Sequence, residues 1–250
     1  MLMFSRRDLE NMSRKLLSQY LRRSQAQHDR IDPEDFAKTM FGIEYEFRKL
    51  STTGEVLGMT SFDDFGVEVW DADGTPEWFC LDRYTALIDL CLKEEGQEGR
   101  RHFTMMHEAA HQILRIFFPS EYGVQYRTMP VRYYLATPMR GRVTDWEEWQ
   151  ANVLASSLLL PRELILKHMD RLGLKPIRIL NKRYAIREYE LFSSIAETLG
   201  VSRQALAIRM KQLGLLEREY LRNPDDLLNV YMEDDEWKTY LSPAPTQLLQ

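Results

Sequence analysis

Apolar residues recur at helical spacing near the start of the chain. Between residues 6 and 23, apolar positions such as Leu9 and Tyr20 share one face and alternate with arginines and lysines, which predicts an amphipathic helix. Its basic face could contact nucleic acid, but a helix that docks by its Leu and Met stripe and leaves its charges in solvent is favoured. A second helix is expected to begin at Pro33 and to continue through Phe47.

The spacing changes to strand-like alternation between residues 51 and 82. Apolar positions alternate with polar ones on both sides of Asp73-Gly74, which is typical of a β-hairpin closed by an Asp-Gly turn. A helix is expected again near residues 84–92, before a charged linker over 93–101. The pattern therefore predicts an α+β fold that is mainly helical and contains a small β-sheet.

The composition is that of an ordinary soluble globular protein, because 44% of the 250 residues are apolar and the formal net charge is -5. Disorder, a collagen-like chain and a disulfide scaffold are excluded for the chain as a whole. No apolar run approaches the roughly 18 residues of a membrane span, and the start lacks the apolar core of a signal peptide. We therefore expect a cytoplasmic protein without membrane contact, in which Cys80 and Cys91 are reduced thiols.

Metal-binding chemistry is concentrated in residues 103–118, which contain the pattern His-Glu-x-x-His without any Gly or Pro. Residues four apart on a helix differ by about 40° in rotation and about 6 Å in rise, so His107 and His111 can direct their imidazoles at one ion. Glu108 is offset by about 100°, which keeps it out of the ligand set but within reach of a metal-bound water as general base. The alternative is a pair of hydrogen-bonded core histidines on a buried helix.

A catalytic zinc ion needs a third protein ligand from outside this helix and keeps one position open. Leu114 and Phe117 occupy the positions where a metzincin has a Gly and a third His, so that class is excluded. His102 and His168 are possible ligands, although the first lies at the helix start and the second lies beyond a helix break at Pro161. The third ligand is therefore expected on another downstream helix.

Residues 144–161 form that helix, with signals at both of its ends. Thr144 and Glu147 make a capping box, so Glu147 is expected to fold back on the helix start. This leaves Glu148 as the better third ligand. Asn152 lies one turn further on the same face, where it can hydrogen bond the outer nitrogen of a ligating His.

Three motifs of this region resemble the ImmA/IrrE family of zinc metallopeptidases. They are Phe103-Thr104 before the His-Glu-x-x-His pattern, Glu148-x-x-Ala151-Asn152, and Leu158-Leu159-Leu160-Pro161. The resemblance is specific over residues 101–162 and weaker over 187–216. Ala110 replaces the Gly that is common before the second His, a change that a helix tolerates.

The resemblance implies a zincin-like metallopeptidase fold with one Zn2+ ion per chain. It implies that His107, His111 and Glu148 bind this ion and that Glu108 is the catalytic residue. It also implies cleavage of a cytoplasmic regulator, typically a helix-turn-helix repressor encoded nearby, in a bacterium, a phage or a mobile element.

The stretch between the two ligand helices, residues 119–143, is rich in Pro, Gly, Tyr and Arg and is longer than the resemblance leads us to expect. It must lie near the site, because both of its ends belong to ligand helices. A basic, tyrosine-rich loop could grip an acidic or extended peptide and stabilise the oxyanion of the tetrahedral intermediate. An ordinary surface loop with packing aromatics is the alternative. The candidate substrate-binding residues are Tyr126, Arg132, Tyr133 and Tyr134.

A two-helix pattern follows over residues 187–216. Gly200 and Ser202 stand where a helix-turn-helix has its turn glycine and the cap of its second helix. DNA reading is disfavoured in an acidic chain, and the resemblance implies a structural or substrate-docking role at least as readily. The candidate contacts to DNA or a partner are Arg203, Gln204 and Arg209.

Four parts are expected along the chain. They are an N-terminal amphipathic helix (1–30), a zincin-like metallopeptidase domain (31–172), a helix-turn-helix-like segment (173–220), and an acidic peripheral helix with a tail (221–250).

We predict a zinc-dependent endopeptidase that cleaves a repressor with a Glu-activated water. Two alternatives stay open. One is a non-catalytic regulator that binds DNA or a repressor and holds a structural metal. The other is a toxin-antitoxin or phage component that binds its partner without cutting it.

Overall fold

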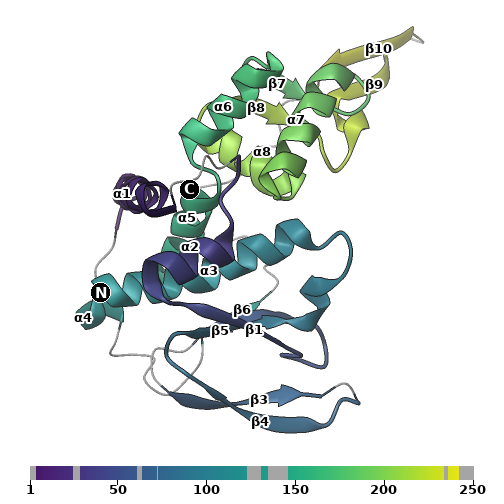
Figure 1. Cartoon of the computed structure of the whole chain (residues 1–250). Coiled ribbons are helices and arrows are strands. Elements are labelled where there is room, and N and C mark those ends of the chain that lie inside the picture. Colours follow the sequence, from purple (N-terminus) through teal and green to yellow (C-terminus); the bar gives the residue numbers. More distant parts are fainter. Residues whose placement is uncertain are drawn as a thin grey trace. The chain divides into compact units, whose positions relative to one another are not determined.

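The chain forms two compact units, Met1–Pro161 and Arg162–Gln250. The structure is a computed structural model that describes residues 4–24, 29–60, 64–71, 73–122, 131–134, 146–233 and 236–241 (Figure 1). In these described residues, no helix combines the length and the apolar character that crossing a membrane requires.

The first unit contains a four-stranded sheet with helices packed on it. Its elements are α1 (Arg6–Ser24), α2 (Pro33–Phe41), β1 (Glu44–Arg48), β2 (Val56–Thr60), β3 (Phe65–Trp70), β4 (Pro76–Leu81), β5 (Thr85–Asp89), the short 3-10 helix η1 (Leu90–Lys93), α3 (Glu98–Phe117), α4 (Pro119–Tyr122), β6 (Val131–Tyr134) and α5 (Trp146–Leu159). The order of strands in the sheet is β1-β5-β2-β6. β1 runs parallel to β5, whereas β2 is antiparallel to both β5 and β6.

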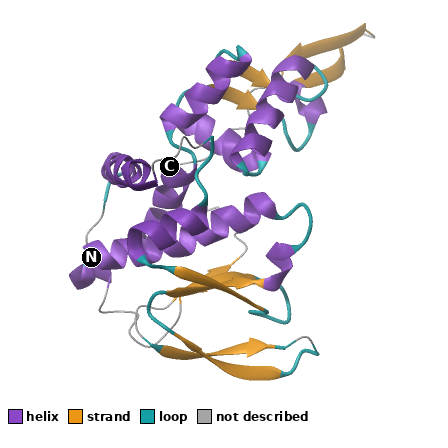
Figure 2. Cartoon of the chain, viewed as in Figure 1, coloured by secondary structure: helices purple, strands orange, loops and turns teal. Residues whose placement is uncertain are grey.

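The sheet is covered on both faces. Figure 2 shows α2 and α3 on one side and the β3–β4 hairpin on the other. Towards the hairpin, the core contains Leu50, Val56, Met59, Val67, Val69, Leu81 and Leu87. Towards α3, it contains Leu57, Ile88, Leu92 and Met105. Because two apolar layers enclose it, β2 is buried along its whole length.

Two hydrogen bonds fix α3 on the sheet. The Gln112 side chain donates to Thr60 Oγ1 over 2.6 Å, and both residues are almost fully buried. The Tyr45 hydroxyl of β1 donates to the carbonyl of Met105 over 2.8 Å. On its other side α3 packs against α5, and α5 in turn packs against α1. Most of the apolar stripe predicted for α1 is buried, with Leu9 and Tyr20 at 0% exposure, although Leu21 is 45% exposed.

The second unit is a small helical body with two short sheets. Its elements are α6 (Arg162–Leu172), β7 (Ile177–Leu180), α7 (Ile186–Leu199), α8 (Arg203–Gln212), β8 (Leu216–Glu219), the 3-10 helix η2 (Pro224–Leu227), β9 (Leu228–Glu233) and β10 (Glu236–Leu241). β7 pairs with β8 in parallel. Gly200 ends α7 with a φ of 65°, and Ser202 caps α8 by accepting a hydrogen bond from the Ala205 amide over 3.1 Å. The turn glycine and the cap that the sequence predicts are therefore present.

Three segments predicted as helix are instead wholly or partly strands. The second helix ends at Phe41, where Gly42 has a φ of 70° and its amide closes the last turn, and residues 44–48 then form β1. Residues 85–89 are β5, between β1 and β2. Residues 228–233 and 236–241 pair as two antiparallel strands, β9 and β10, in place of the expected acidic helix. Short apolar runs fit either structure, and pairing with a distant strand decides between them.

The unit boundary at Pro161 also differs from the predicted domain limits. The helix α6 was expected to close the metallopeptidase domain, but it belongs to the second unit. The N-terminal helix α1 was expected to be a separate part, but it belongs to the first unit, where the amide of Phe4 donates to the Gln150 side chain over 3.0 Å.

Asp89, at the end of β5, links the segment after β1 to the start of η1, and this generates a prediction for stability. Its buried carboxylate accepts hydrogen bonds from the amides of Leu50 (2.7 Å) and Cys91 (2.9 Å). Asp89→Ala leaves both donors without their acceptor and should lower the free energy of unfolding by about 2–3 kcal/mol. Urea denaturation followed by tryptophan fluorescence measures this. Asp82→Ala, at an exposed aspartate before the same strand, should cost little, and equal losses in the two variants would contradict the assignment.

Candidate metal centre

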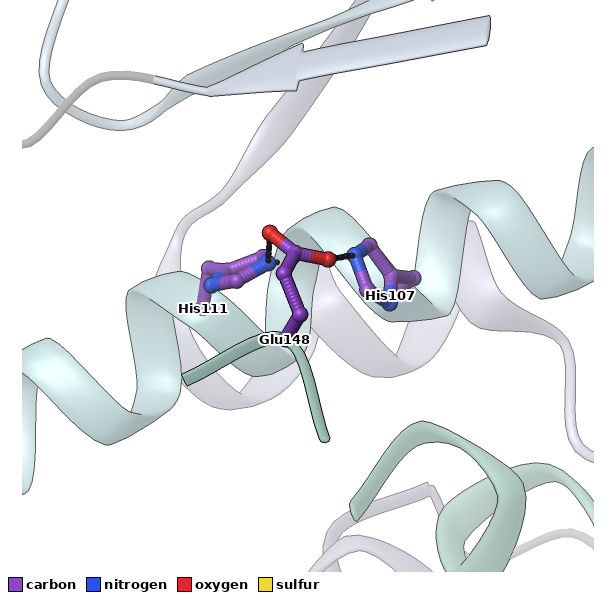
Figure 3. Close-up of side chains that lie close together, drawn as sticks. All are labelled: His107, His111 and Glu148. Atoms are coloured by element: carbon purple, nitrogen blue, oxygen red, sulfur yellow. Dashed lines mark hydrogen bonds and ion pairs between the residues drawn. The ribbon is translucent and has the colours of Figure 1, made fainter. Parts of the chain in front are cut away.

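Two histidines and one glutamate converge between α3 and α5 (Figure 3). His107 Nε2 lies 3.2 Å from Glu148 Oε2, and His111 Nε2 lies 3.3 Å from Glu148 Oε1. The two imidazole Nε2 atoms are 3.0 Å apart. In the described part of the chain, this is the one group of three His, Cys, Asp or Glu side chains that gather closely enough to hold a metal ion.

The positions follow from local helix geometry. His107 and His111 are one turn apart on the face of α3 that packs against α5, and they are 0% and 1% exposed. Glu148 comes from the first turn of α5 and its side chain stays 28% exposed. The structure thus brings together the three side chains that the sequence singled out.

The distances fit a tetrahedral ion. Two ligand atoms that each lie about 2.0–2.1 Å from such an ion are about 3.3 Å from one another. The two Nε2 atoms are 3.0 Å apart, and each of them lies 3.2 or 3.3 Å from a different oxygen of Glu148, so each of these neighbouring pairs is close to this value. Because imidazole lone pairs and a carboxylate face the same point, a cation there satisfies all three groups at once.

The charge states of these groups also suit metal binding. Burial lowers the pKa of His107 below its usual range, against the opposing influence of Glu148 and Asn152. Burial alone would raise the pKa of Glu148, but its hydrogen bonds with His107 and His111 hold that pKa well below the usual range. A neutral imidazole and an ionised carboxylate are the forms that bind metals.

Glu108 lies next to His107 in the sequence, and its side chain lies against β2 of the sheet. It is 0% exposed, and no described residue donates a hydrogen bond to either of its carboxyl oxygens. Burial, reinforced by the charge of Glu148, raises the pKa of Glu108 well above its usual range. A hypothetical Cβ on Gly58 of β2 would lie 2.5 Å from Glu108 Oε1, so the strand backbone closely borders this carboxyl.

Among the described residues, the other candidates for the third ligand do not belong to this group. His102 is buried, and its Nε2 is 3.8 Å from Glu98 Oε1. His168 belongs to α6 in the second unit, where its Nδ1 is 3.3 Å from Arg171. Glu147 is buried in α5, but Thr144 lies outside the described residues, so the capping box stays a prediction.

The predicted substrate-binding residues are placed only in part. Tyr126 lies outside the described residues. Arg132, Tyr133 and Tyr134 belong to β6, whose backbone pairs with β2 and sets Tyr133 opposite Gly58. Nothing is described of their side chains, so their roles stay predictions.

The predicted DNA or partner contacts need one correction. Arg203 is exposed and its guanidinium lies 5.9 Å from the ring centre of Tyr189, while Gln204 is half-buried. Arg209, however, is only 1% exposed, because it lies on the inward face of α8 with Leu206 and Met210. A side chain buried in this way is not part of a contact surface, so the prediction for Arg209 is wrong.

The close contact between Gly58 and Glu108 was not predicted from the sequence. An isolated glycine inside a strand often marks a close approach of another group to the backbone, and this signal was available.

The burial of Glu108 predicts a cost in stability. In protein stripped of metal by a chelator, Glu108→Met replaces a buried carboxyl with an apolar side chain of similar size. It should raise the free energy of unfolding by about 1–3 kcal/mol in urea denaturation. Because the pKa of Glu108 is raised in the folded protein, wild-type stability falls as pH rises above its unfolded value, so the gain should increase with pH.

The exposed Glu190 of α7 provides the control for this experiment, since Glu190→Met should change stability little at any pH. A Glu108→Met variant less stable than the wild type would show that the carboxyl contributes to folding.

Comparison with known protein families identifies a match over the region that contains the candidate metal ligands. The model of the peptidase M78 family, described as the IrrE N-terminal-like domain, matches residues 64–211. No curated protein matches the chain. The family match includes the His-Glu-x-x-His helix and the helix of Glu148 and covers more than half of the 250 residues. The chain therefore belongs to the peptidase M78 family, as its resemblance to ImmA/IrrE proteins predicted.

Proposed function

We propose that this protein is a zinc-dependent endopeptidase. The observation that carries the proposal is the convergence of His107, His111 and Glu148, with the buried Glu108 on the same helix. Membership of a peptidase family agrees with this chemistry. Two histidines and one carboxylate are the ligand set of many catalytic zinc sites, and a three-ligand site leaves a position for the reacting molecules.

Each residue has a distinct role in the proposed reaction. When bound, the zinc ion lowers the pKa of a water molecule and polarises the scissile carbonyl. Glu108 accepts the proton of the attacking water and passes it to the leaving amine, so that one peptide bond is replaced by a carboxyl group and an amine. A raised pKa suits this role, because the same carboxyl must first take and then release the proton.

Asn152 supports the site without touching the reacting atoms. Asn152 raises the pKa of His107 against the effect of burial, so its side chain lies close to that imidazole. Such a partner fixes the orientation of a ligating ring. We assign Asn152 this orienting role.

The proposed substrate is a protein, and the resemblance to ImmA/IrrE proteins favours a helix-turn-helix repressor. β6, which carries Arg132 and Tyr133, lies beside β2, and β2 borders Glu108. A substrate segment near Glu108 would therefore lie close to β6. DNA binding by the second unit is the weaker alternative, because the burial of Arg209 leaves only Arg203 and Gln204 of its proposed contacts.

Metal content tests the ligand set. Wild-type protein purified without chelators should contain about one zinc ion per chain by elemental analysis, and Glu148→Ala should lose most of it. Glu163→Ala, which removes an exposed first-turn glutamate from α6, should retain it. A wild type without metal, or zinc content indifferent to Glu148, would refute the proposed centre.

Loss of cleavage with retention of metal tests the role of Glu108. Glu108→Gln keeps the size of the side chain but removes its basicity, so cleavage should fall by about 100-fold or more while zinc stays bound. The assay co-expresses the protein with helix-turn-helix proteins encoded beside its gene and detects products by intact mass. Glu147→Gln on α5 serves as the matched control. Normal cleavage by Glu108→Gln would disprove the mechanism.

A further inference from the structure

Gly58 occupies the point where β2 comes closest to Glu108. It lies between Ile88 of β5 and Tyr133 of β6, its partners in the sheet. The pairing of β2 with β6 shifts by one position between Val56 and Gly58, which is the signature of a β-bulge. Through this irregularity both Leu57 and Gly58 contribute to the side of the sheet that α3 covers.

A side chain at this position has no room. A methyl group added to Gly58 would lie 2.5 Å from Oε1 and 2.9 Å from Cγ of Glu108, and 2.7 Å from Cγ2 of Thr104. All three distances are well below ordinary carbon contacts of about 3.5–4.0 Å. Two of the three atoms belong to Glu108, so any adjustment would move that side chain first.

The glycine is not required by backbone conformation. Gly58 is absent from the glycines with positive φ, so alanine could adopt the same backbone. The requirement at this position is therefore one of space.

Neither the strand nor the helix is free to move apart. Thr60, two residues along β2, accepts the 2.6 Å hydrogen bond from Gln112, and Leu57 packs with Met105 in the core under α3. Thr104, Glu108 and Gln112 are four residues apart and thus form the face of α3 towards β2. Contacts on both sides of Gly58 hold this face against the strand.

We propose that Gly58 is a positioning residue for Glu108: the absent side chain leaves the space that the carboxyl occupies against β2. The catalytic part of this inference rests on the proposed function, whereas the steric part does not. Gly58 itself does not touch the reacting atoms.

A double-mutant cycle in metal-free protein tests the steric part. Gly58→Ala should lower the melting temperature by about 3 °C or more, because overpacking a close-packed core is destabilising. Glu108→Ala removes both of the Glu108 atoms that the new methyl group meets, so Gly58→Ala should cost clearly less in that background. Equal losses in both backgrounds would overturn the proposal. If Gly58→Ala alone does not fold, recovery of folding in the double variant supports the proposal, and failure to recover overturns it.

Gly66 provides a matched control. It also lies within a strand, but a methyl group there would meet only the ring of the exposed Trp78, at 3.3 Å. Gly66→Ala should show the same small effect whether or not Glu108 is present. If removing the Glu108 side chain changed the cost of Gly66→Ala as much as it changes the cost of Gly58→Ala, the double-mutant cycle would not report local contact. That result would overturn the proposal.

Activity tests the catalytic part. With zinc bound, Gly58→Ala should lower kcat about tenfold or more on the repressor that the wild type cleaves, while KM and zinc content stay close to wild type. Unchanged kcat together with an inactive Glu108→Gln variant would overturn the positioning role and leave the proposed function standing. Normal cleavage by Glu108→Gln would instead refute the proposed function, and the melting cycle would still decide whether Gly58 makes room for Glu108.

Discussion

The candidate centre depends on one helix that is fixed on two faces. α3 directs Thr104, Glu108 and Gln112 towards β2, and directs His107 and His111 towards α5. Because each set repeats every four residues, a single rigid element places the proposed base and two proposed ligands with little freedom between them. The third ligand comes from α5, so the packing of two helices, rather than a loop, sets the separations within the trio.

This arrangement keeps polar groups where folding alone would favour apolar ones. Both histidines and Glu108 are buried, and no described residue donates a hydrogen bond to the carboxyl of Glu108. The same burial gives these groups their chemistry, since it favours the neutral imidazole of His107 and the protonated form of Glu108. Groups with shifted pKa values that gather in this way are typical of functional sites.

The trio was predictable from the sequence because it depends on local rules. Four-residue spacing on a helix without Gly or Pro, and a Glu in the first turn of a second helix, require no knowledge of the sheet. The strands at 44–48 and 85–89 were not predictable in this way, because their pairing joins segments about 40 residues apart. The roles of Gly58 and Arg209 were not predictable for the same reason, because distant residues set their environments. Gly58 lies against Glu108, and Arg209 is buried within the second unit.

The family match bears on how the second unit is interpreted. It extends past the boundary at Pro161 to residue 211, close to the end of α8. The helices α6, α7 and α8 thus belong to what the family shares and are not an addition peculiar to this chain. The burial of Arg209 and the inward-facing apolar residues of α8 favour a structural role for this region. Packing within the unit is a sufficient reason for two helices joined by a turn with a glycine and a serine cap. A role in DNA binding would need exposed contact residues in addition to this turn.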